Sequence, residues 1–129
     1  MSETKKARLT DLHNEHKEWT SQLAFCKDEI DVFEIRLSDF VQRFTATKVL
    51  AEIERFQNQF IRQREVIDII NHRIGLKRQS LEQFSRKNPR LTNLAVFTDH
   101  DDLRNEMESF NRIYKDLKKD YQKLLLKLL

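Results

Sequence analysis

The sequence predicts an all-α fold, an elongated antiparallel three-helix bundle with coiled-coil-like heptad packing and a short extra helix between the second and third helices. Apolar residues recur at alternating steps of three and four along three long segments, which indicates helices that each bury one stripe. One glycine and one proline in 129 residues are too few for the tight turns of a β fold. This length fits a single helical-bundle domain over residues 1–129, with a flexible N-terminal tail at residues 1–7.

The first helix is expected over residues 8–44. Its heptad stripe never slips, and every position except His16 is apolar or a thiol. At 1.5 Å per residue the striped segment would be about 54 Å long. The stripe consists of Leu9, Leu12, His16, Trp19, Leu23, Cys26, Ile30, Phe33, Leu37, Phe40 and Phe44.

The second helix is expected over residues 46–86 and carries a stripe of the same spacing. Gly75 lies inside it, and the stripe continues in the same frame beyond this residue. We therefore expect an unbroken helix that tolerates the glycine at a cost of about 1 kcal/mol. The stripe consists of Ala46, Val49, Ile53, Phe56, Phe60, Gln63, Ile67, Ile70, Ile74, Lys77, Leu81 and Phe84.

The heptad phase changes between Phe44 and Ala46, which predicts that the chain reverses there. We expect the reversal at residues 45–47, with a threonine as the N-cap of the second helix. The alternative is one continuous helix over residues 9–86 that pairs with a second chain.

Charges that flank the two stripes bear on the register of the hairpin. Glu15 would face Arg73, and Arg36 would face Glu52, at positions that set orientation in coiled coils. On the other edge Lys27 would fall near Arg64, which is a like-charge contact, so the evidence from charge is mixed.

Pro89 ends the second helix and opens the short helix, which is expected over residues 89–96. The last helix is expected over residues 99–128, capped by Thr98 and Asp101 in a variant of the capping box. Its stripe consists of Leu103, Met107, Phe110, Tyr114, Leu117, Tyr121, Leu124 and Leu128. Three stripes, with the tryptophan in the first of them, resemble a spectrin-type three-helix unit in architecture, and no function is carried over from it.

The net charge of +3 hides a division of charge along the chain. Residues 9–44 carry eight acidic and four basic side chains, whereas residues 46–87 carry nine basic and five acidic ones. These segments complement each other, so no basic stripe remains to follow a phosphate backbone. Lysines surround the leucine-rich C-terminal end, but its apolar face continues the heptad stripe. Nucleic-acid and membrane-surface binding are therefore the less favoured alternatives, and we expect no nucleic acid, no membrane and no small-molecule substrate as a partner.

The single cysteine, Cys26, excludes an internal disulfide and a cysteine zinc cluster. The first residues are polar and charged, without the apolar segment of a secretory signal. The longest purely apolar run, at residues 94–97, is too short to cross a bilayer. We expect a cytoplasmic protein.

No catalytic residue, cofactor or enzyme activity is expected. A di-iron bundle needs a glutamate three residues before a histidine on two helices, and none of the histidines here has one. His13 and His16 lie one turn apart, and His100 and Asp101 fall at the same end if the third helix is parallel to the first. These four residues are candidate ligands for zinc or another divalent ion, which makes a metal-binding bundle the alternative function.

The chain has more apolar residues than one helical core requires, and some of them align outside the stripes. The candidate interface residues are Phe25, Val32, Ile35, Ile69 and Leu76. Because contiguous apolar patches usually mark contacts, we expect a non-enzymatic interaction or scaffold protein that forms a homodimer or binds another helical protein. The alternative is that residues 91–97 fold back and cover one patch.

Overall fold

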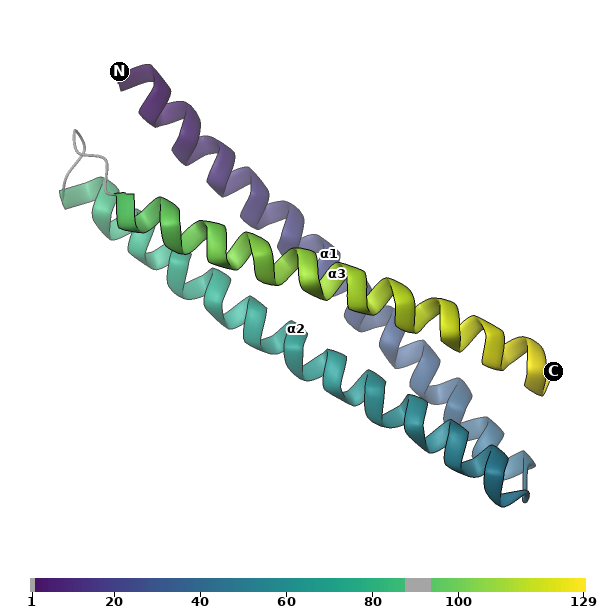
Figure 1. Ribbon diagram of the computed structural model, residues 1–129. Helices are drawn as coiled ribbons and strands as arrows, with labels where there is room; N and C mark the ends of the chain where they lie inside the picture. Colours follow the sequence, from purple (N-terminus) through teal and green to yellow (C-terminus); the bar gives the residue numbers. More distant parts are fainter. Residues whose placement is uncertain (1, 88–93) are drawn as a thin grey trace.

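The computed structural model describes residues 2–87 and 94–129, with side chains described for residues 10–83, 86 and 100–129. These residues form three helices and no strand: α1 (Ser2–Arg43), α2 (Thr47–Lys87) and α3 (Leu94–Leu128). The predicted all-α class is therefore confirmed. Figure 1 shows the three helices packed as a bundle, with the two ends of the chain at opposite ends of it.

One apolar core joins all three helices. It runs from Trp19 and Leu23 on α1, past Phe60 on α2, to Phe110 and Tyr121 on α3. Full burial of each large apolar side chain contributes about 1.5–3 kcal/mol, so this core is the main source of stability. Most positions of the three predicted stripes are buried, as expected for heptad positions that face the other helices.

The chain leaves the helical conformation at residues 44–46, where α1 ends and α2 begins. The Phe44 amide donates to the Phe40 carbonyl at 3.1 Å, and the Leu50 amide donates to the Ala46 carbonyl at 3.0 Å. The carbonyl of an N-cap residue accepts the first bond of its helix, so Ala46 is the N-cap of α2 and the predicted threonine cap is wrong. The break also contradicts the alternative of one continuous helix over residues 9–86.

The helix α3 begins at Leu94, before the predicted start at residue 99. Thr98 lies inside the helix and not at its N-cap. Asp101 accepts a hydrogen bond from Arg104 at 3.0 Å, one turn further along α3, so the predicted capping box is wrong. The separate short helix is not confirmed, because residues 88–93 lie outside the described residues and the rest of it belongs to α3.

The helix α1 begins at Ser2, so it includes most of the predicted tail at residues 1–7. The flexibility of residues 1–7 stays a prediction. The helix α2 continues without a break through Gly75, as predicted. Within the two described stretches, no helix combines the length and the apolar character needed to span a membrane.

Candidate functional site

Two histidines that we named as candidates meet in the bundle. The His16 ring on α1 and the His100 ring on α3 are fully buried, with their centroids 5.1 Å apart. Trp19 packs against both: its ring stacks on His100 at 5.2 Å and lies 5.7 Å from His16. We refer to His16, Trp19 and His100 as the histidine cluster.

An ion pair lies beside the histidine cluster. Glu15, next to His16 in sequence, accepts hydrogen bonds from Nε and Nη2 of Arg104 at 3.1 and 2.7 Å. Its carboxylate also lies 4.0 Å from Nε2 of His100. A bidentate arginine–carboxylate pair of this kind is stronger than a single hydrogen bond. The hydrogen bond from Arg104 lowers the pKa of Glu15.

The histidine cluster favours neutral imidazoles. Within the described part of the chain, neither ring nitrogen of His16 has a hydrogen-bond partner, and neither does Nε2 of His100. Burial, and then the nearby His100 and Arg78, lower the pKa of His16 to about 4. Burial likewise lowers the pKa of His100, against a smaller opposing effect of Glu15. Both rings are therefore uncharged near pH 7 and are not poised to exchange protons there.

The other two metal candidates do not join this cluster. His13 is exposed on α1, and the Asp101 carboxylate is exposed and pairs with Arg104. Among the residues whose side chains are described, no three histidine, cysteine or acidic groups lie close enough together to hold a metal ion. His16 and His100 lie together at one end of the bundle, but the four candidates do not form one site.

The ion pairs between helices differ from the expected register. Glu15 binds Arg104 on α3 and not Arg73, and Arg73 pairs with Glu106, also on α3. Glu52 pairs with Lys127 of α3 at 3.2 Å. The reason is geometric: the third helix faces one flank of α1 and one flank of α2, so these flanks are unavailable to a two-helix hairpin.

The contact between α1 and α2 uses the remaining flanks. Arg64 on α2 lies 2.6 Å from the Asp31 carboxylate and 2.8 Å from that of Glu34. Lys27 pairs with Asp68 at 2.9 Å. Lys27 and Arg64, which the hairpin register brought near each other, therefore each pair with acidic side chains across this contact.

The predicted interface residues are exposed but do not form one surface. Their exposed fractions range from 50% to 66%, so none belongs to the core. Phe25 lines a depression of about 300 Å³ between α1 and α3, whereas Ile69 lines a larger one between α2 and α3. The candidate interface residues therefore lie on different sides of the bundle.

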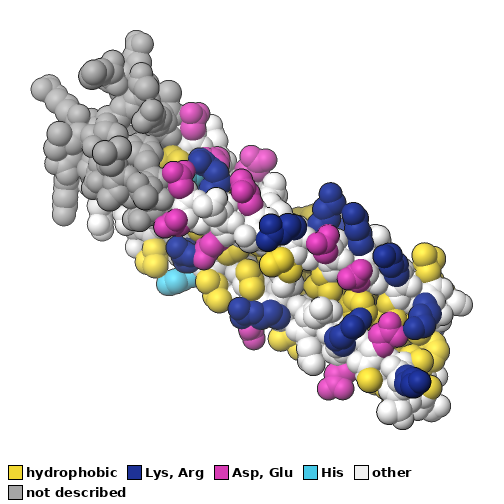
Figure 2. All heavy atoms as spheres, viewed as in Figure 1, with side chains coloured by type: hydrophobic (Ala, Val, Ile, Leu, Met, Phe, Trp, Pro, Cys, Tyr) yellow, Lys and Arg dark blue, Asp and Glu magenta, His cyan; other side chains and the backbone are white. Residues whose placement is uncertain are grey.

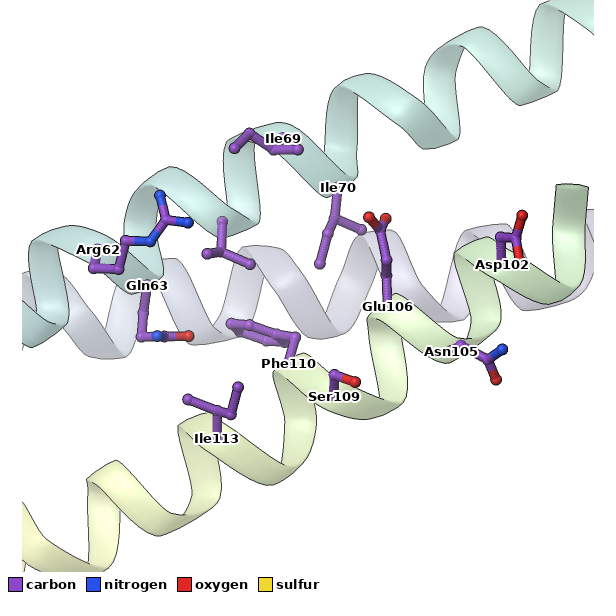
Figure 3. Close-up of a pocket in the computed structure, with 11 residues that line it drawn as sticks. Arg62, Gln63, Ile69, Ile70, Asp102, Asn105, Glu106, Ser109, Phe110 and Ile113 are labelled. Carbon is purple, nitrogen blue, oxygen red and sulfur yellow. The ribbon is translucent and has the colours of Figure 1, made fainter.

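The larger depression, which we call the α2–α3 groove, has a volume of about 530 Å³. Figure 3 shows Arg62 near one end, Asp102 near the other, and the apolar side chains of Ile69, Phe110 and Ile113 between them. Its full lining is Arg62, Gln63, Val66, Ile69, Ile70, Asp102, Asn105, Glu106, Ser109, Phe110 and Ile113.

Several residues of these sites were not predicted from the sequence, and Ile113 and Arg104 are two examples. Ile113 is 48% exposed on the rim of the α2–α3 groove, and its position beside the heptad stripe could have identified it. Arg104 could not have been assigned to Glu15, because their pairing depends on how α3 packs against α1.

Cys26 lines the smaller depression together with Phe25, but its own side chain is almost fully buried. Burial, followed by the nearby Glu29 carboxylate, raises the pKa of its thiol. The thiolate is the reactive form, so this environment disfavours a nucleophilic cysteine. Comparison with known proteins adds no assignment: no family model, no curated protein and no solved structure matches this chain.

Proposed function

We propose that this chain is a non-enzymatic interaction or scaffold module, an antiparallel coiled-coil-like three-helix bundle that acts by forming a homodimer in the cytoplasm. The observation that carries the proposal is the set of large apolar side chains exposed along the outside of the helices. Single exposed apolar residues are common, but aligned ones mark contacts with other molecules.

Large apolar side chains remain exposed on α1 and α2 outside the buried core. Phe25 and Val32 lie two turns apart on one side of α1, and they are 62% and 56% exposed. Ile69 and Leu76 have the same spacing on α2 and are about half exposed. Covering such side chains is favourable by roughly 25 cal/mol for each Å² removed from water, which is a driving force for association.

The antiparallel arrangement is supported by ion pairs in register. Glu15 pairs with Arg104 and Glu29 pairs with Lys118, each across 89 positions, so residue numbers rise together along α1 and α3. The pairs that join α2 to α3 behave oppositely, since the numbers fall on one helix as they rise on the other. This is the pattern of an up-down-up bundle.

A structural role also agrees with the environment of the reactive residue types. The pKa of His16 lies well below neutral pH, and the raised pKa of Cys26 keeps its thiol protonated. An enzyme usually tunes such groups toward the working pH, and these are shifted away from it.

Sedimentation velocity on the full chain tests the proposal. We expect a dimer at concentrations of tens of micromolar, and a folded monomer when Phe25, Val32, Ile69 and Ile113 are all replaced by aspartate. These four side chains are about half exposed or more, so the helical circular dichroism of this variant should match the wild type. A wild-type protein that stays monomeric at these concentrations would contradict the proposal.

A further inference from the structure

We infer that a second copy of this chain packs its own α2–α3 groove against this one in a two-fold arrangement, with α3 of one copy antiparallel to α3 of the other. The inference rests on the proposed self-association and specifies its surface and its orientation. The α1 side, with Phe25 and Val32, then stays outside the dimer contact.

The α2–α3 groove suits a helix better than it suits a small molecule. Its floor is formed by the buried side chains of Ile70 and Phe110, and its rims carry Ile69 and Ile113, which are 50% and 48% exposed. The groove follows two helices that lie side by side, so the two rims of a second copy can pack along both of its rims. Ser109 lies near the middle of the α3 rim, where a small side chain allows close approach of another helix.

The distribution of charged residues along α3 favours an antiparallel second copy. The first part of α3, residues 99–108, contains five acidic and one basic residue, whereas residues 109–129 contain six basic and two acidic ones. Figure 2 shows acidic side chains gathered toward the start of α3 and basic ones toward its end. Two α3 helices that run antiparallel place the acidic half of each against the basic half of the other, and a parallel pair places like charges together.

The two ends of the groove also carry opposite charges. Asp102 is exposed near one end, and Arg62 is 63% exposed near the other. A two-fold axis across the middle of the groove exchanges its two ends, so Arg62 of each copy comes to the level of Asp102 of the other. The surface is therefore complementary to itself, which is the requirement for a closed homodimer.

The first experiment locates the surface by sedimentation equilibrium. Replacing Ile69 and Ile113 by aspartate should give a folded monomer, because two charges then lie on the rims of the groove. The matched control replaces Phe25 and Val32 by aspartate and should remain a dimer. These two side chains are at least as exposed as Ile69 and Ile113, so the two variants disturb the fold to a similar degree. A monomeric control together with a dimeric groove variant would overturn the inference and leave the proposed self-association intact.

The second experiment tests the orientation by charge reversal at low ionic strength. Arg62→Asp alone and Asp102→Arg alone should each raise the dimer dissociation constant severalfold, because each places like charges at the same level of the contact twice per dimer. The exposed pair between Arg62 and Glu65 contributes little to folding, so both variants should keep their helical content.

Mixing the two single variants is the decisive step. In the antiparallel arrangement each copy then meets opposite charges at both ends, so a heterodimer should form from two weakly associating proteins. Its formation also demonstrates that both variants are folded. A mixture that associates no better than its components would overturn the antiparallel arrangement, and a wild type that never dimerises would overturn this inference and the proposed function together.

Discussion

His16 and His100 lie fully buried against each other although their ring nitrogens are polar. Unpaired buried polar groups reduce stability, and a buried charge reduces it much further. Since three of the four ring nitrogens lack partners among the described residues, the fold is compatible mainly with neutral rings. The charged neighbours of the two rings are Glu15 on α1, Lys77 and Arg78 on α2, and Asp101 and Arg104 on α3.

We predict that the protein loses stability between pH 7 and pH 5. The pKa of His16 falls from 6.5 to about 4 on folding, so the unfolded chain binds protons in this range and the folded chain does not. Stability therefore falls as the pH falls, by about 2 kcal/mol at pH 5 for His16 alone, and levels off below the folded pKa. His100 acts in the same direction. Urea unfolding at both pH values measures the loss.

The control for this prediction is His16→Leu, which keeps an apolar side chain of similar size in the cluster. The lowered pKa of Glu15 affects stability mainly below its ordinary value of 4.5, so it contributes little between pH 7 and pH 5. The substitution should reduce the difference between pH 7 and pH 5, and His100 should account for what remains. An unchanged difference would mean that His16 is not the group responsible.

A pair of buried tyrosines on α3 gives a second prediction. The Tyr114 hydroxyl donates to the Glu29 carboxylate at 2.9 Å, whereas the buried Tyr121 hydroxyl lies near Arg36 without a hydrogen bond of acceptable geometry. Tyr114→Phe should therefore lower the free energy of unfolding by about 1–2 kcal/mol, since it removes a bond to a charged group. Tyr121→Phe deletes the same atom and should change it by less than about 0.5 kcal/mol. Equal losses in thermal unfolding would refute this account.

Each helix could be predicted from the sequence because its period is a local property. The stripes of α1, α2 and α3 identify residues that are in fact buried, such as Ile30, Ile67 and Met107. The helix ends were predicted less well. Ala46 caps α2 although threonines lie on both sides of it, because tertiary packing fixes where the chain turns.

Gly75 gives a prediction at the scale of the helix. It lies exposed inside α2, and a Cβ built on it meets no described atom within 4 Å. Gly75→Ala should therefore raise the free energy of unfolding by about 0.5–1 kcal/mol, because alanine loses less backbone entropy in a helix. Thermal unfolding followed by circular dichroism measures the change. The neighbouring exposed substitution His72→Ala serves as the control and should have a smaller effect.

For the whole molecule, the sequence could not predict which charged flank of each helix faces which neighbouring helix. Opposite charges allow Glu15 to pair with Arg73 or with Arg104, and only the position of α3 decides between them. The same holds for the candidate site. His16 and His100 could be placed at one end from chain direction alone, but the rotation of each helix about its axis determines that His13 and Asp101 face outward. The surface and the partner of the proposed dimer stay predictions.

The stacking of Trp19 on His100 has a spectroscopic consequence. Trp19 is the single tryptophan of the sequence, and its ring lies between 5 and 6 Å from both imidazoles. An imidazolium quenches indole fluorescence on contact, whereas a neutral imidazole quenches it weakly. The emission of the protein therefore reports, without any added dye, whether this end of the bundle is closed, protonated or open to water.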